Sequence, residues 1–323
     1  MGEPGSIAPE ISIAAWQHFQ KLGTLSFFVI GDIELLRACD PDVPVQSIDA
    51  PDQAQSVFTT ALPVLYQAVE NTVTTGVADP ANAHSVLASI RRAVDFALNK
   101  KVGGIVTNPI QKQSLYEAGF SFQGHTDYLA DLARQAGHAA NPVMMLSAKN
   151  LRTVPITVHI ALKEVPAALN GELIIAQTRT SAEGLSRWFG LNRPRIGITG
   201  LNPHAGENGA MGQEEIEIIT PAIETLKEEG LDVTGPLPAD TVFHEEARAN
   251  YDIFMCMYHD QALIPVKTLG FHDGVNTTLG LPFIRTSPDH GTALTLAGKG
   301  LANPASLIAA INQAAEMVCH ARG

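Results

Sequence analysis

The sequence has few cysteines, and their spacing fits neither disulfide bridges nor a metal site. Only three occur among 323 residues, Cys39, Cys256 and Cys319, and no CxxC pair is present. A small disulfide-stapled fold and a thiolate zinc site are therefore excluded. We expect three reduced thiols that are mostly packed inside the fold.

Long apolar runs, an excess of positive charge and the common phosphate-loop motifs are also missing. No run approaches the roughly 18–20 apolar residues of a membrane helix, and residues 1–5 lack the basic and apolar regions of a signal peptide. Lys plus Arg number 21 against 33 Asp plus Glu, a net charge of −12, which disfavours binding to a nucleic-acid backbone. We expect a cytoplasmic protein with neither nucleic acid nor membrane as partner.

No GxGxxG follows a predicted strand, and GxxxxGK[ST] does not occur. A dinucleotide, if one binds, is therefore not held by the usual Rossmann turn.

Short apolar runs alternate with helical patterns along the chain, and 45% of the residues are hydrophobic, enough for a sizeable core. This alternation predicts an α/β fold with largely parallel sheets, and the length predicts about two domains. The predicted strands are 25–30, 102–106, 142–146, 151–158, 195–199 and 253–258. The predicted helices are 84–99, 213–229 and 305–318.

Three of the eleven histidines, His159, His204 and His259, each follow an apolar strand. Ligands of open α/β sheets collect at the carboxyl ends of strands, so these imidazoles are candidate metal ligands for zinc, cobalt, nickel or iron. The alternative is that each histidine ends a strand or packs between domains. Their spacing matches no local metal motif.

Charged and amide side chains near these histidines are further candidates. Asp260 follows His259 directly, and Asp240 lies in a Leu-Pro-Ala-Asp-Thr segment, so either carboxylate is a candidate to orient a ligand or act as a base, although Asp240 also suits a plain turn. Lys267 and Arg285 lie in an apolar region, where cations are costly unless they meet an anion. With Asn276 they suit a phosphate or carboxylate, or else internal ion pairs.

Several longer motifs resemble the 4-hydroxythreonine-4-phosphate dehydrogenase family essentially from end to end. They are Gly2-Glu3-Pro4-Gly5-Ser6-Ile7-Ala8-Pro9-Glu10, Gly124-His125-Thr126-Asp127, Gly200-Leu201-Asn202-Pro203-His204-Ala205-Gly206-Glu207, Tyr258-His259-Asp260-Gln261, and the stretch from Gly274 to Thr292 with Leu281-Pro282-Phe283-Ile284-Arg285.

The resemblance implies a two-domain fold like that of isocitrate and isopropylmalate dehydrogenases, with an interdomain cleft. One domain is expected at about 1–125 plus 270–323, and a dimerisation and metal domain at about 126–269. The family begins with a strand before the Gly-Glu-Pro motif, so we expect either a misassigned start or one strand fewer in the sheet.

The resemblance also implies an NAD- or NADP-dependent oxidoreductase of vitamin B6 synthesis. The family oxidises 4-phosphooxy-threonine at carbon 3, and decarboxylation then gives 3-amino-2-oxopropyl phosphate. It implies a homodimer with an active site shared between subunits and one divalent ion per site, Zn, Mg, Mn or Co.

Each candidate residue takes its role from this resemblance. The implied metal ligands are His159, His204 and His259. The implied substrate-binding residues are His125, Thr126, Lys267, Asn276 and Arg285. Asp240, Asp260 and Lys267 are implied near the reacting centre. The segment from His290 to Pro304 is similar to the adenine-side loop of isopropylmalate dehydrogenases, so the residues expected to bind the dinucleotide are His290, Gly291, Thr292, Ala293 and Asn303.

Two alternatives stay open at this stage. One is a paralogue acting on 4-phospho-threonate, 4-phospho-erythronate or a cis-dihydrodiol. The other is a metal-binding or regulatory protein that has lost turnover.

Overall fold

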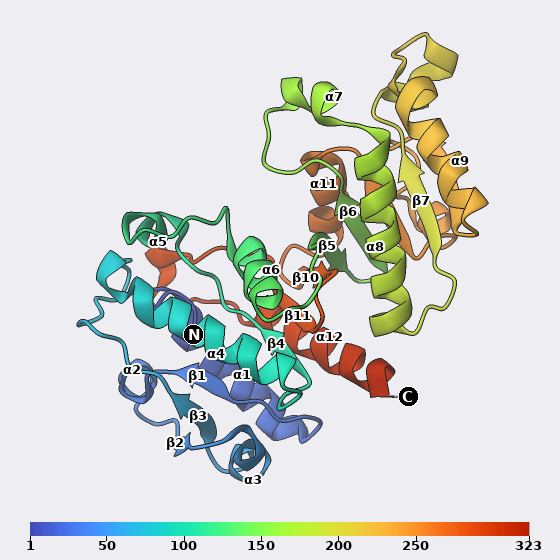
Figure 1. Cartoon of the computed structure of the whole chain (residues 1–323). Coiled ribbons are helices and arrows are strands. Elements are labelled where there is room, and N and C mark those ends of the chain that lie inside the picture. Colours follow the sequence, from blue (N-terminus) through green and yellow to red (C-terminus); the bar gives the residue numbers. More distant parts are fainter. Residues whose placement is uncertain (323) are drawn as a thin grey trace. The chain divides into compact units, whose positions relative to one another are not determined.

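The structure, a computed structural model, describes residues 1–322 and divides into two compact units. Unit 1 comprises Met1–Ala140 with Leu281–Ala315, and unit 2 comprises Asn141–Gly280 with the residues from Glu316 onward (Figure 1). The first division falls after residue 140, rather than at the expected 125, because α6 (His125–Gln135) packs its Tyr128 and Leu129 into the same apolar cluster as Val86 and Ile90 of unit 1. The last described residues, from Glu316 to Arg322, belong to unit 2, where His320 lies against Gly190.

Unit 1 holds two sets of parallel strands. Its strands are β1 (Val29–Gly31), β2 (Val45–Ile48), β3 (Leu62–Tyr66), β4 (Gly104–Val106) and β11 (Ile284–Pro288). The first three form a parallel sheet in the order β1-β3-β2, so β1 and β2 are its edges, and β11 pairs with β4 in parallel.

The helices of unit 1 cover these strands on both sides. They are α1 (Ala8–Leu22), α2 (Ile33–Cys39), α3 (Ala54–Phe58), α4 (Ala83–Leu98), α5 (Lys112–Glu117), α6 (His125–Gln135) and the first part of α12 (Ala305–Arg322). One buried cluster joins α1 and α12 to Leu62 and Val64 of β3, and another joins the neighbouring Leu65 to Phe96 of α4. Because successive strand residues point to opposite faces, the sheet is covered on both.

Unit 2 is built on six strands in the order β10-β5-β6-β9-β7-β8. They are β5 (Val143–Ala148), β6 (Leu151–Pro155), β7 (Arg195–Thr199), β8 (Asp232–Leu237), β9 (Ile253–Cys256) and β10 (Val275–Leu279). The β10-β5 and β5-β6 pairs are antiparallel, whereas β6, β9, β7 and β8 run parallel to one another.

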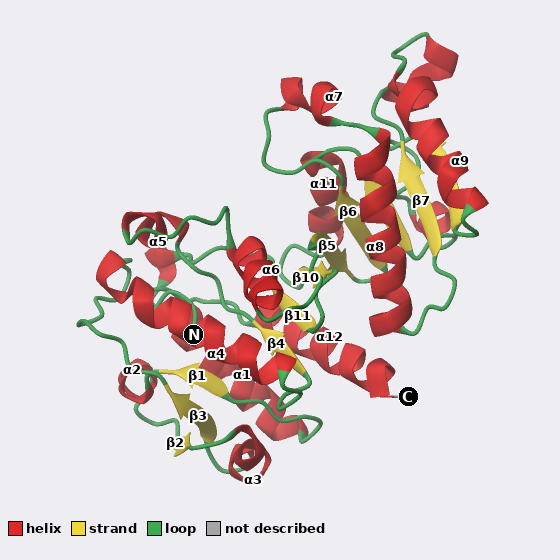
Figure 2. Cartoon of the chain, in the orientation of Figure 1, coloured by secondary structure: helices red, strands yellow, loops and turns green. Residues whose placement is uncertain are grey.

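Helices lie on both faces of this sheet, as Figure 2 shows for α8 and α11. The helices are α7 (Val165–Ala168), α8 (Gly171–Phe189), α9 (Thr220–Glu228), α10 (Glu245–Arg248) and α11 (His259–Leu269). Ile253 and Met255 of β9 join the cluster that contains α8 and α9, while Phe254 and Cys256 join the one that contains α11. The strand is therefore apolar at every position, which is why it appears in the sequence as a continuous run.

The expected α/β fold with mostly parallel sheets is confirmed, and the strand predicted at Arg195–Thr199 is found with those bounds. The helix predicted at 213–229 is composite, a π-helical turn at Glu215–Ile219 followed by α9. Five strands, β2, β3, β8, β10 and β11, were not predicted. Among residues 1–322, no helix has both the length and the apolar character needed to cross a membrane.

The prediction that the cysteines are mostly packed is wrong for two of the three. All are free thiols, but only Cys256 is buried, at the end of β9, while Cys39 and Cys319 are exposed. Both exposed cysteines lie at or near the end of a helix, where an amphipathic pattern gives little indication of burial.

Candidate active site

The three strand-end histidines all belong to unit 2, and they follow three neighbouring strands. His159 comes after β6, His259 after β9 and His204 after β7. These strands are adjacent in the order β6-β9-β7 and run parallel, so their carboxyl ends lie along one edge of the sheet. The topology places all three histidines at this edge.

His159 and His259 lie close together, with ring centroids 5.8 Å apart. His259 is the first residue of α11, and its Nδ1 is 2.7 Å from Oδ1 of Asp260. A carboxylate at Nδ1 orients the ring and leaves Nε2 for another ligand. A Zn–N bond of about 2.0–2.1 Å puts two imidazole centroids roughly 5 Å apart in a tetrahedral site, so the spacing of this pair fits a shared ion.

His204 is exposed and does not complete a metal site with this pair. It opens a left-handed turn, and both it (φ 52°) and His159 (φ 54°) have positive φ angles, which are uncommon outside glycine. Within the part of the chain that the structure describes, no three His, Cys, Asp or Glu side chains form a group that could hold a metal ion. One copy therefore presents two imidazoles together and the third apart.

Gln261 fixes the ends of the strands that lead to His204 and His259. Its Oε1 accepts hydrogen bonds from Thr199 Oγ1 and from the Met257 amide, both at 2.7 Å, and its Nε2 donates to the Gly200 carbonyl at 2.8 Å. This buried amide ties the end of β7 to the end of β9. Gln261 was not among the predicted site residues, because a glutamine that bonds to backbone groups of other strands carries no signal in the sequence.

The remaining unit 2 candidates differ in their surroundings. Asp240 is exposed in the turn after β8, which fits the turn-forming alternative. Lys267 is half-buried on α11, with Nζ 5.7 Å from the ring centroid of Phe271. Asn276 lies on β10, and its Oδ1 is buried with no hydrogen-bond partner among the described residues. A buried acceptor of this kind is suited to a donor from a ligand.

The candidates in unit 1 centre on Arg285, a buried cation of β11. It is 4% exposed, and its Nε and Nη2 donate to Thr107 Oγ1 at 3.1 and 2.7 Å. Burial lowers the pKa of Arg285 to about 10. Thr107 was not a predicted site residue, because an isolated threonine carries no signal in the sequence.

His125 and Thr126 begin α6, both half-buried. Burial lowers the pKa of His125 well below its ordinary value, and the Arg285 guanidinium and the Met1 amino group lower it further. Its Nε2 is buried with no hydrogen-bond partner among residues 1–322. A neutral imidazole next to a buried guanidinium is therefore available to a ligand.

The predicted dinucleotide segment follows β11. Thr292 is buried and donates from Oγ1 to Gln111 Oε1 at 2.9 Å, and Ala293 has a left-handed backbone with φ 44°. His290 Nδ1 lies 2.9 Å from the Gly291 carbonyl. Asn303 Oδ1 accepts from the Ala305 amide at 3.0 Å, so it caps the start of α12.

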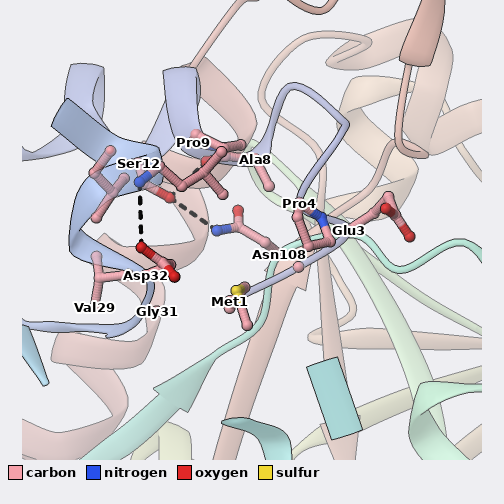
Figure 3. A pocket seen from close by; sticks show the side chains of 13 residues that line it. Met1, Glu3, Pro4, Ala8, Pro9, Ser12, Val29, Gly31, Asp32 and Asn108 are labelled. Carbon is pink, nitrogen blue, oxygen red and sulfur yellow. Dashed lines mark hydrogen bonds between the residues drawn. The ribbon is translucent and has the colours of Figure 1, made fainter. Parts of the chain in front are cut away.

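A small pocket in unit 1 has none of these candidates in its lining. It is lined by the start of the chain, α1, β1 and Asn108, whose Nδ2 donates to Ser12 Oγ at 2.9 Å (Figure 3). None of the predicted substrate or dinucleotide residues lines it.

Largely parallel α/β units with titratable side chains at the carboxyl ends of adjacent strands define the class of this protein, an α/β enzyme. The family model "Pyridoxal phosphate biosynthetic protein PdxA" matches residues 24–314. The chain belongs to this PdxA family.

Relatives with an assigned name are similar to this chain over nearly its whole length. The 4-hydroxythreonine-4-phosphate dehydrogenase of Bradyrhizobium diazoefficiens is 48% identical over 98% of this chain and 95% of its own length. The enzyme of the same name from Caulobacter vibrioides is 49% identical over 98% of this chain and 95% of its own length. The crystal structure of the Klebsiella pneumoniae 4-hydroxythreonine-4-phosphate dehydrogenase has a TM-score of 0.88 at 38% identity, covering 98% of this chain and 96% of that one. The predicted family is confirmed, and so is the prediction of an oxidoreductase.

Proposed function

We propose that this chain oxidises 4-hydroxythreonine 4-phosphate at carbon 3, with NAD or NADP as hydride acceptor, in vitamin B6 synthesis. The β-keto acid then loses CO2 to give 3-amino-2-oxopropyl phosphate. The observation that carries the proposal is the set of His159, His259 and His204 at the carboxyl ends of adjacent parallel strands. The names of the relatives supply the substrate.

The residues present fit a divalent metal ion, Zn, Mg, Mn or Co. His159 and His259 would hold it, since their rings are spaced for a shared ligand and Asp260 orients one of them. Imidazole nitrogens favour zinc or cobalt over magnesium. Such an ion, when bound, lowers the pKa of the substrate hydroxyl and polarises the ketone formed from it.

The active site belongs, in this proposal, to a homodimer in which His204 completes the ligand set of the other copy. Two observations support it. His204 stands apart from the pair within one chain, and apolar side chains are exposed in the same segments. Val158 and Ile160 flank His159 with 37% and 40% of their surface exposed, and Met211 and Ile216 follow His204 with 46% and 50%. Exposed apolar groups of this kind are typical of a protein interface.

Anion binding falls to the remaining substrate residues. Arg285 and Lys267 supply positive charge for the phosphate and carboxylate, and Arg285 does so from a buried position where its charge is little screened. Neutral His125, with Thr126 and Asn276, supplies hydrogen bonds to the same groups. Together they fix the substrate for reaction.

Proton transfer falls to a carboxylate. Asp260 contacts His259 and Asp240 follows β8, so each is a candidate to accept the hydroxyl proton.

The segment from His290 to Ala293, with Asn303, is proposed to bind the dinucleotide. The three free thiols are consistent with a reducing, cytoplasmic location.

A substrate panel tests the proposal. Metal-stripped protein is assayed with 4-hydroxythreonine 4-phosphate, both dinucleotides and each of the four metals, and the reduced nicotinamide is followed by its absorbance. Metal-dependent turnover of this substrate is expected. Turnover of 4-phospho-threonate, 4-phospho-erythronate or a cis-dihydrodiol in its place would overturn the proposed substrate assignment. Metal binding without any hydride transfer would overturn the proposed dehydrogenase activity.

A further inference from the structure

The segment that carries His204 has an unusual backbone. Residues 204–208 are five consecutive residues in the left-handed region, with φ angles of 52°, 53°, 80°, 43° and 54°. Only Gly206 among them is a glycine, and left-handed residues other than glycine normally occur singly. The turn is therefore held by contacts from outside it.

The carboxylate of Glu215 provides those contacts at the base of the turn. It is 3% exposed, and its Oε1 accepts hydrogen bonds from the amides of Leu201 and Asn202, both at 2.7 Å. Its Oε2 accepts a hydrogen bond from Asn202 Nδ2 at 2.9 Å, and the same Nδ2 also donates to Glu214 Oε2 at 2.7 Å. One buried group thus binds the segment just before His204 at three points, two backbone amides and one side-chain amide.

The turn also packs directly against this carboxylate. A Cβ atom on Gly206 would lie 2.6 Å from Glu215 Oε2, and one on Gly200 would lie 3.0 Å from Oε1. The contact at Gly206 is closer than Cβ atoms come to other heavy atoms, and the one at Gly200 is tighter than most, so glycine at these positions lets the loop close around Glu215. Gly206 additionally needs its positive φ of 80°.

We propose that Glu215 is the positioning residue for His204. It does not touch the ion or the substrate; it holds the left-handed turn in the shape that presents the His204 imidazole as a ligand. This inference rests on the proposed function, since it takes His204 to be a metal ligand.

Cobalt binding tests the inference without an activity measurement. Co2+ is titrated into the full-length, metal-stripped protein, and its affinity and visible d–d spectrum are recorded beside the melting temperature. Glu215→Gln puts an NH2 group opposite Asn202 Nδ2, donor against donor. Gly206→Ala leaves the carboxylate in place but pushes the turn away from it. Glu217→Gln, an exposed position in the same π-helical turn, is the matched control.

We expect Glu215→Gln and Gly206→Ala each to weaken Co2+ binding by about 10- to 100-fold and to give the d–d spectrum of His204→Ala. The control keeps the affinity and spectrum of the original protein. A purely structural role would lower the melting temperature but leave the affinity and spectrum of the folded protein unchanged.

The outcomes separate the two proposals. If His204→Ala binds Co2+ like the original protein, the ligand assignment in the proposed function fails, and this inference with it. If His204→Ala loses the ion while folded Glu215→Gln keeps the original affinity and spectrum, the positioning role alone is overturned. Should Glu215→Gln not fold, Gly206→Ala decides by the same criteria.

Discussion

The imidazole rings of His159 and His259 lie with their centroids 5.8 Å apart, although the two residues are distant in the sequence. The parallel pairing of β6 with β9, in which Pro155 is opposite Cys256, brings them together. Past that pair the Ile156 amide still donates to the Cys256 carbonyl at 2.7 Å, which keeps the two segments in register toward the histidines.

Replacing His159 with glycine is expected to abolish tight divalent-metal binding while leaving stability nearly unchanged. The ring is exposed, and glycine adopts the φ of 54° without the cost of about 1 kcal/mol that histidine incurs. Metal content after dialysis and a urea unfolding curve check both parts. His244→Ala, at another exposed histidine of unit 2, should leave metal binding intact; equal loss in both variants would count against the assignment.

Replacing Arg285 with lysine is expected to lower kcat/KM for the phosphorylated substrate by roughly 10- to 100-fold. Lysine keeps the charge but not the planar fork that donates twice to Thr107. Steady-state kinetics check this, with Arg37→Lys on the surface as the control. Unchanged kcat/KM in Arg285→Lys would contradict a role in anion binding.

Glu3 makes a pH-dependent contribution to stability. Burial, with a smaller contribution from Asp79, raises the pKa of Glu3 to about 7 from 4.5, against the opposing hydrogen bond from the Gly5 amide. The folded state therefore holds the proton more tightly than the unfolded state, so this stabilisation is present below pH 4.5 and is lost as the pH rises through about 7.

Glu3→Gln does not titrate, so its melting temperature should rise relative to the original protein between about pH 5 and about pH 8. Thermal unfolding at the two pH values measures this difference. A difference in melting temperature that is the same at both would show that the carboxyl has no shifted pKa.

Gln261→Leu is expected to destabilise the protein by about 3 kcal/mol, because the buried Met257 amide and Gly200 carbonyl lose their partner. The free energy of unfolding in urea gives the value. Gln46→Leu, on an exposed position of β2, controls for the loss of an amide. A cost below about 1 kcal/mol would mean that other groups or water satisfy these atoms.

The sequence predicted the strands that are continuously apolar and the histidines that follow them. β9 is buried at every position, so it appears as an unbroken apolar run, and β6 and β7 are buried at all but one position each. β10 and β11 contain Asn276, Arg285 and several threonines and serines, whose burial depends on partners that only the fold supplies.

The supporting residues of the candidate site were beyond sequence reasoning for a similar physical reason. Gln261 and Glu215 act through contacts with backbone groups of other segments, and no spacing in the sequence marks such contacts. Glu215 in particular lies in a helical pattern where glutamate usually faces solvent. The left-handed turn at 204–208 contains only one glycine, so its composition gives little indication of a left-handed backbone.

The most direct test of the central claim is the oxidation of 4-hydroxythreonine 4-phosphate by metal-stripped protein before and after one divalent ion per site is restored, measured in parallel for His159→Gly, His204→Ala and His259→Ala. We predict no reduced nicotinamide without metal, full activity once it is restored, and no recovery in any of the three variants. Undiminished turnover in the stripped protein, or in a variant that lacks one of these imidazoles, would contradict the account.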